Sequence, residues 1–251
     1  MLVTTDAIIL RSYNLAEADR IVVCLTRTAG LVRAVAKGAR RMKSRFGAAL
    51  EPFTLVRLAF YEKENRELVN LSSAEILKSN FDVAAQVEVA EVLGYMSELI
   101  GEFAPPHEAN EKLFRMVQAC VDALASAPES AKLILRYFEI WLLRLAGSFP
   151  DTSACAVCGR SSAAGQPLYV SVEGTARCAS CSRGIGTPLA VSTQEFLRAS
   201  QKLGPAQFAT AHQSSFSQTE PEVAELTHRL IVRVLDRRPR TMIAPGTAAG
   251  S

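Results

Sequence analysis

In the segment LVRAVAKG, residues 31–38, an apolar residue occupies every second position from Val32 to Ala36, and two of the residues between and after them are cations. Side chains two apart in a β-strand point to the same face, so this alternation predicts a strand with one buried and one exposed face. The buried face would hold Val32, Ala34 and Ala36, and the exposed face Arg33, Val35 and Lys37. The exposed side of this strand is therefore expected to be cationic.

The segment FTLVRLAFYEK, residues 53–63, repeats the pattern. Val56, Leu58 and Phe60 would face inward, and Arg57, Ala59, Tyr61 and Lys63 outward. Three more β-branched, apolar segments are predicted as strands, at residues 6–13, 20–26 and 67–77. Five strands in about 80 residues, joined mostly by short turns, favour a small antiparallel barrel over a parallel sheet.

Beyond residue 82 the apolar period lengthens to three and four residues, which predicts helices. Three of them would cover residues 83–103, 110–126 and 130–147, with Asn110 and Ser130 as N-caps and Gly147 as a stop. Two more follow at residues 192–204 and 219–235. Each of these begins with the pattern of a capping box, Ser192 with Glu195 and Thr219 with Glu222.

The connection AKGARRMKSRFG, residues 36–47, concentrates positive charge. No Asp or Glu lies between Asp19 and Glu51, whereas eight Lys and Arg residues do, so with a net charge of +3 the rest of the chain is net negative. Such asymmetry indicates a polyanionic partner. Cations on a loop are often simply solvated, but here the adjoining strand faces are cationic too and carry an aromatic ring. This combination favours nucleic-acid binding by phosphate contacts and base stacking, through Arg33, Lys37, Arg40, Arg41, Lys43, Arg45, Arg57 and Tyr61.

Four of the six cysteines form two C-x-x-C pairs, Cys155 with Cys158 and Cys178 with Cys181, separated by 19 residues. This spacing is typical of a structural, four-cysteine zinc site holding one Zn²⁺ per chain. Two disulfides or a redox-active C-x-x-C are the alternatives, and the expected reducing compartment disfavours the disulfides. Cys24 and Cys120 lie in apolar patterns and are predicted to be buried.

No combination of residues points to catalysis. The basic connection lacks the spacing of a phosphate-binding G-x-x-x-x-G-K-[ST] loop, and none of the three histidines accompanies a nucleophile. We therefore expect no enzymatic activity. No segment is apolar enough to span a membrane and the N-terminus does not resemble a secretory signal, so we expect a cytoplasmic protein.

The order of these parts resembles the bacterial RecO family of recombination mediator and DNA repair proteins. The resemblance rests on DAIILRSYNLAEADRIV, on KGARRMKSR followed by LEPF, and on CAVCG with CASC. It implies an α+β chain, with an OB-fold barrel, a mainly helical domain and an inserted zinc finger. It also implies binding of single- and double-stranded DNA, annealing of complementary strands, nucleoid association, and RecA loading onto DNA coated by the single-strand binding protein SSB, together with RecR in the RecF pathway.

We divide the chain accordingly. The OB-fold domain would cover residues 1–80, the helical domain residues 81–149 and 188–240, the zinc finger residues 150–187, and a disordered tail residues 241–251. An alternative function is a zinc-bearing RNA-binding or assembly module, in which the same cations contact structured RNA. A nuclease ranks third, because no metal-binding carboxylates accompany the basic segment.

Overall fold

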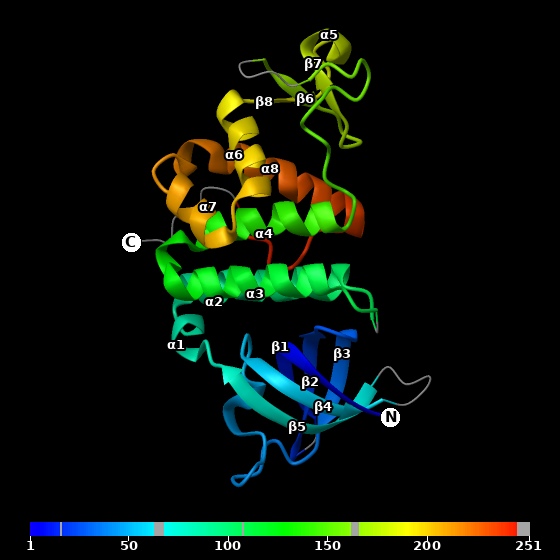
Figure 1. Cartoon of the computed structure of the whole chain (residues 1–251), viewed down its shortest axis with the longest axis vertical. Helices are drawn as coiled ribbons and strands as arrows, with labels where there is room; N and C mark the ends of the chain where they lie inside the picture. The colour runs from blue at the N-terminus through cyan, green and yellow to red at the C-terminus, as the bar shows by residue number, and fades with distance from the viewer. Residues whose placement is uncertain (16, 63–67, 107, 162–165, 245–251) are drawn as a thin grey trace. The chain divides into compact units, whose positions relative to one another are not determined.

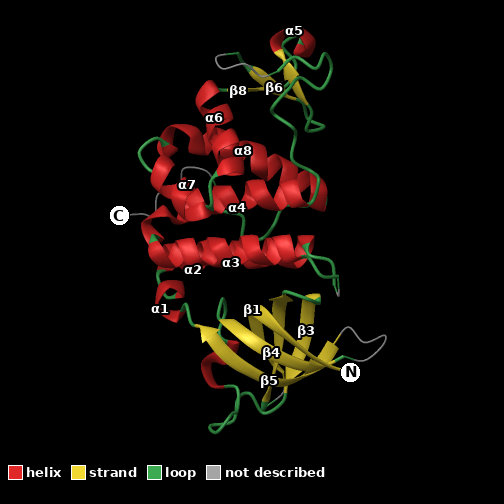
Figure 2. Cartoon of the chain, viewed as in Figure 1, coloured by secondary structure: helices red, strands yellow, loops and turns green. Residues whose placement is uncertain are grey.

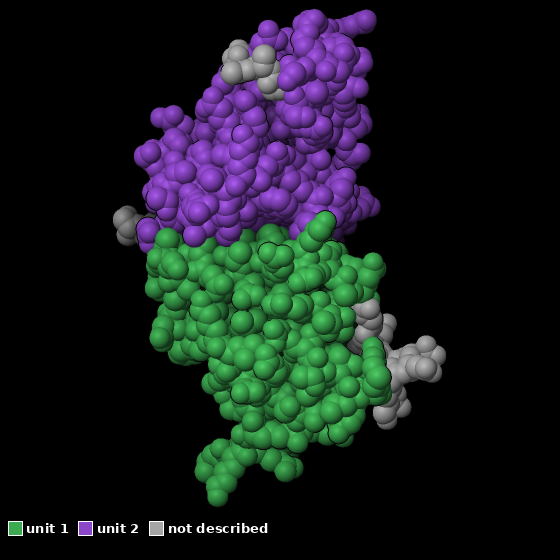
Figure 3. All heavy atoms as spheres, viewed as in Figure 1, with its two compact units in different colours: residues 1–128 green, residues 129–251 purple. Residues whose placement is uncertain are grey.

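The computed structural model describes residues 1–15, 17–62, 68–106, 108–161 and 166–244 (Figure 1). The chain forms two compact units, residues 1–128 and 129–251 (Figure 3). Strands dominate the first part of the first unit, and helices make up most of the second, apart from a small sheet in the cysteine-rich segment (Figure 2). The predicted α+β class is confirmed, while the domain boundaries given above stay a prediction.

Five strands close into a barrel in the order β1-β2-β3-β5-β4. They are β1 (Leu2–Leu15), β2 (Asp19–Thr26), β3 (Gly30–Ala36), β4 (Leu55–Tyr61) and β5 (Leu68–Lys78). All neighbours are antiparallel except β3 and β5, which run parallel. The five predicted strands and the predicted OB-type barrel are therefore confirmed.

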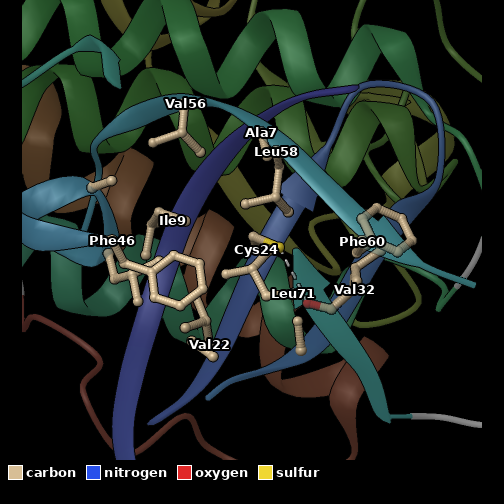
Figure 4. Packing of buried hydrophobic residues seen from close by; sticks show 14 of the residues in the cluster. Ala7, Ile9, Val22, Cys24, Val32, Phe46, Val56, Leu58, Phe60 and Leu71 are labelled. Atoms are coloured by element: carbon tan, nitrogen blue, oxygen red, sulfur yellow. Dashed lines mark hydrogen bonds between the residues drawn. The ribbon is translucent and has the colours of Figure 1, made fainter. Parts of the chain in front are cut away.

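The barrel interior is filled by the apolar face that the alternation predicts. Val32, Ala34, Val56, Leu58 and Phe60 are fully buried there, beside side chains from the other three strands (Figure 4). A short 3₁₀ helix, η1 (Gly47–Leu50), adds Ala49 and Leu50 to the same core. A small barrel has room only for side chains in its interior, so this packing makes it a rigid support for its loops.

The turn between β2 and β3 is fixed to a later part of the first unit. Gly30 has φ of +61°, and a Cβ there would lie 2.2 Å from the carbonyl oxygen of Glu108. The N–H of Leu31 points at the carbonyl of Pro105, 3.5 Å away. Only glycine fits this close approach, which ties the barrel to the segment joining α2 (Val87–Phe103) and α3 (Glu111–Ser126).

The remaining elements are as follows. The first unit also contains α1 (Phe81–Ala84), and η2 (Pro128–Ser130) lies at the boundary between the units. The second unit contains α4 (Ala131–Leu145), β6 (Leu168–Val170), β7 (Ala176–Cys178), α5 (Ala179–Ser182), β8 (Thr187–Leu189), α6 (Val191–Lys202), α7 (Pro205–His212) and α8 (Phe216–Leu235). The predicted helices are present. Asn110 caps α3 by accepting from the N–H of Leu113, as expected, and Gly147 ends α4 with φ of +67°.

Ser130 lies at the N-cap of α4, as predicted, although its hydroxyl donates to the side chain of Gln213 instead of capping the helix. The two predicted capping boxes are wrong. Helix α6 begins at Val191 with Ala190 at its N-cap. Helix α8 starts three residues before Thr219, so Glu222 lies inside it. The carboxylate of Glu222 instead accepts from the N–H of Ala190 and the hydroxyl of Thr193 at the start of α6. A capping interaction that looks local in sequence is thus made between two helices.

An ionic cluster lies in the core of the second unit. The guanidinium of Arg136, fully buried on α4, contacts the carboxylates of Glu139 at 2.6 Å and Glu220 at 3.2 Å. Thr227 also donates to Glu139. Burial alone would raise the pKa of Glu139, but the charge of Arg136 holds it below its usual value. Each charge in the cluster therefore depends on the others to remain buried.

We predict that Arg136→Met lowers the free energy of unfolding of the second unit by about 3–5 kcal/mol, because it removes the guanidinium that pairs with both Glu139 and Glu220 in the core. Denaturant unfolding followed by the fluorescence of Trp141, the single tryptophan, reports on this unit. Lys202→Met, at an exposed position of α6, is the control and should change stability by less than about 0.5 kcal/mol. Equal effects of the two substitutions would contradict the role assigned to the cluster.

Candidate nucleic-acid interface and candidate metal centre

The cationic loop, residues 37–46, leaves the barrel at the end of β3 with a well-defined backbone. Gly38, at φ of +70°, donates its N–H to the carboxylate of Asp19 at 2.8 Å, and the N–H of Arg40 bonds to the carbonyl of Ala18 at 2.9 Å. Two further turns follow, Arg41 N–H to Gly38 and Ser44 N–H to the carbonyl of Arg41. The backbone is thus hydrogen-bonded while its cationic side chains are exposed: Lys37, Arg40, Arg41, Lys43 and Arg45.

The far end of the cationic loop is anchored in the barrel core. The side chain of Phe46 is buried among residues of the strands (Figure 4). The guanidinium of Arg45 lies 4.9 Å from the centre of the Phe46 ring, and one of its nitrogens is 3.5 Å from the carbonyl of Leu71. Arg45 therefore combines a positive charge with a packing role at the base of the loop.

The acidic residues that flank the loop do not neutralise its side chains. Asp19 accepts from a backbone N–H, and Glu51 lies 3.5 Å from the guanidinium of Arg20. The side chains of Lys37, Arg41 and Lys43 form no ion pair or hydrogen bond with any residue that the structure describes. These three cations are solvated and accessible to an external anion.

The strands place the other predicted residues on the outer face of the barrel. Arg33 is exposed on β3, as the alternation predicts, Lys37 is exposed in the turn directly after this strand, and Tyr61 is exposed on β4. Registered pairs link Val35 on β3 to Asn70 on β5 and Asn70 to Tyr61, so the strand of Tyr61 lies two strands away from β3. Lys63 lies outside the described residues.

Arg57 lies nearer the start of β4 than Tyr61 and, unlike Arg33, has a carboxylate beside it. It precedes Tyr61 by four residues, about 13 Å along the strand. Its guanidinium is 3.4 Å from the carboxylate of Asp6, which also lies 3.8 Å from Arg27. An exposed ion pair of this kind contributes little stability, but it lowers the positive electrostatic potential at Arg57 and so its attraction for an external anion.

A β-bulge in β1 brings two further side chains to the outer face. The pairing with β2 shifts between Ile9 and Arg11, so Ile9 faces the barrel interior while Arg11 and Tyr13 face outward. Strict alternation from Ile9 would place Arg11 and Tyr13 inside, so the sequence pattern alone does not identify them as surface residues. Bulges re-aim side chains in this way, but the pattern of β1 contains no clear sign of one.

The four paired cysteines converge in the second unit. Their sulfur atoms all lie within 4.8 Å of one another, and those of Cys158 and Cys178 are 3.9 Å apart. Tetrahedral zinc with bonds of 2.3 Å would separate its thiolates by about 3.8 Å. The donor set and its geometry therefore fit a closed, structural metal site, and all six cysteines are free thiols rather than disulfides.

Backbone N–H groups stabilise the thiolate form of one sulfur, which is the form that binds a metal. Those of Cys158, Cys178 and Val157 point to the sulfur of Cys155 and lower the pKa of its thiol to about 6. Cys24 and Cys120, by contrast, are completely buried, and burial raises the pKa of Cys24 to about 12. The predicted burial of Cys24 and Cys120 is confirmed, and the role of the four clustered cysteines as metal ligands stays a prediction.

Comparison with known proteins places these features in one family. The family model "Recombination protein O N terminal" matches residues 1–80, and "Recombination protein O C terminal" matches residues 90–241. The chain belongs to the RecO family. It is 34% identical to the DNA repair protein RecO of Anaeromyxobacter sp. (strain K) over 248 residues, 97% of each chain. It is 36% identical to that of Koribacter versatilis over 194 residues, 77% of this chain and 78% of the relative.

The N-terminal RecO family model covers the barrel, and the C-terminal one covers the helices from α2 onward and the cysteine cluster. Membership of the RecO family supports a role in DNA repair, as the names of the relatives state. Among the described residues, no helix is both long and apolar enough to cross a membrane.

We predict that the purified protein contains one zinc ion per chain and that Cys178→Ser loses it, because three thiolates close the tetrahedral site incompletely. Metal analysis by mass spectrometry gives the stoichiometry. Cys120→Ser, which removes a buried thiol outside the cluster, should keep the metal. Two disulfides among the four cysteines, or full zinc retention in Cys178→Ser, would overturn this assignment.

Proposed function

We propose that this chain is a recombination mediator that anneals complementary single strands and helps to load RecA onto SSB-coated DNA. The observation that carries the proposal is the cationic loop, whose backbone is fixed at both ends while Lys37, Arg41 and Lys43 have no protein partner among the described residues. Family membership supports DNA as the polyanion.

Annealing of this kind needs no covalent chemistry. Two strands repel each other through their phosphates, and a cationic surface lowers that repulsion while condensed counterions are released. The contacts must be weak enough for the duplex to leave. Exposed lysines and arginines on a loop suit this requirement, because each contributes a screened, sequence-independent attraction.

The proposed mediator would have both DNA and protein partners. It would act on single- and double-stranded DNA at the nucleoid, with RecR, and would engage SSB on the strand to be annealed. The cysteine cluster would hold one structural Zn²⁺ and stabilise residues 150–187, which contain few buried apolar side chains, without taking part in the exchange of strands.

The test is annealing of complementary DNA oligonucleotides at low salt, without a nucleotide cofactor and with or without SSB on the strands. Wild-type protein should accelerate annealing in both cases. The combined substitution of Lys37, Arg41 and Lys43 by Gln should remove most of the acceleration, because it deletes three cations that have no packing role.

The control changes the net charge equally elsewhere. Lys112, Lys202 and Arg238 are exposed and lie outside the cationic loop. Replacing these three by Gln should leave annealing almost unchanged. If wild-type protein does not accelerate annealing, the mediator function is wrong, and tight binding to structured RNA would then favour the RNA-binding alternative. If both triple variants behave alike, the loop has no specific role.

A further inference from the structure

A pocket of about 460 Å³ lies in the first unit, on the outer face of the barrel where α2 meets it. Its lining combines aromatic, apolar and charged side chains: Tyr13, Ile21, Val23, Leu31, Leu68, Arg11, Arg33 and Glu102, with Gly101 of α2 at its edge. Pockets of roughly 300–1,000 Å³ with an apolar lining and few polar groups are the usual size and character of small-ligand sites. This pocket takes no part in the annealing mechanism proposed above.

The register of the strands explains how the pocket is built. Pairing places Arg11 opposite Val23, Val23 opposite Arg33, and Arg33 opposite Leu68, so these four side chains form one row across β1, β2, β3 and β5. Tyr13 begins the next row, opposite Ile21. Because the bulge in β1 turns Arg11 and Tyr13 outward, two cations and an aromatic ring surround an apolar floor.

Arg11 holds the wall of the pocket in place. Its guanidinium donates to the hydroxyl of Ser97 at 3.0 Å and to the carbonyl of Ser97 at 2.8 Å, both on α2. A third nitrogen lies 3.4 Å from the hydroxyl of Tyr13. A Cβ at Gly101 would come within 2.9 Å of this guanidinium, so glycine makes the approach possible. Arg11 is thus a positioning residue.

Arg33 and Tyr13 are the side chains available to a ligand. Arg33 is exposed and makes no ion pair with any described residue, and the Tyr13 side chain, in a residue that is 48% exposed, borders the pocket. Arg33 lies three residues before the end of β3, and the cationic loop begins at Lys37, the first residue after this strand. The pocket and the cationic loop are therefore close together along the chain.

We propose that this pocket holds one unpaired nucleobase of a single strand, stacked on Tyr13, while Arg33 contacts the adjoining phosphate. The inference rests on the proposed DNA-binding function and adds a base-binding site to it. An acidic peptide is the competing occupant, but Glu102 offsets one of the two cations in the lining. The small net charge suits a single phosphate better than a run of carboxylates, and the aromatic ring suits a base.

The test separates base stacking from phosphate contacts. Binding is measured by fluorescence anisotropy with an oligothymidylate and with an oligonucleotide of the same length made of abasic sites. Tyr13→Leu should weaken binding of the oligothymidylate by about fivefold or more, since stacking of one base contributes roughly 1–3 kcal/mol. Binding of the abasic strand should stay unchanged, and Tyr13→Phe should bind both strands like wild type.

Two further variants define the outcomes. Phe81→Leu removes an exposed aromatic ring of α1 outside the pocket and should bind both strands like wild type. Arg33→Gln should weaken both strands to a similar extent, because it removes a phosphate contact. The proposal is overturned if Tyr13→Leu affects the two strands equally or neither of them.

The binding measurements give a different result if the pocket holds an acidic peptide instead of a base. A labelled peptide of three aspartates and a phenylalanine would then bind wild-type protein and lose affinity in Tyr13→Leu, while the oligothymidylate would not. If wild-type protein binds neither oligonucleotide, the DNA-binding function itself fails, which is distinct from a failure of the pocket alone.

Discussion

Closure of the five-stranded barrel is the constraint on which the proposed DNA-binding surface of this chain depends. The parallel pairing of β3 with β5 and the antiparallel pairing of β4 with β1 complete the ring. Once the ring is closed, every strand must direct alternate side chains inward, and the core accepts only apolar ones. Arg33 is on the outer face because its neighbours Val32 and Ala34 fill the barrel interior.

The same closure holds the cationic loop at both ends. The loop leaves the barrel at Lys37 and returns at Phe46, whose ring belongs to the core. The cationic side chains of the loop can therefore change conformation while the backbone of the loop stays in place. A surface of this type binds phosphates weakly and without sequence preference, which is what exchange between single strands and duplex requires.

The sequence predicted the elements whose patterns are local and regular. The alternation predicted the two faces of β3 and of β4 correctly, and the paired cysteines predicted one cluster. Three features could not be predicted, because each depends on tertiary contacts. The bulge at Ile9 and Arg11 reverses the faces of β1, Glu222 caps a helix other than its own, and Arg136 is buried by partners on α8 as well as α4. The positions of Arg57 and Tyr61 relative to β3 likewise follow from the strand order, which the sequence does not state.

The central claim is that the loop cations contact phosphates directly instead of only raising the local potential. The most direct measurement is the salt dependence of single-strand binding, compared between wild-type protein and the variant with Gln at positions 37, 41 and 43. Each lost phosphate contact should reduce the slope of log K against log salt by about 0.7, so three contacts should flatten it by about 2. An unchanged slope would contradict the account, since it would show that these cations release no counterions when DNA binds.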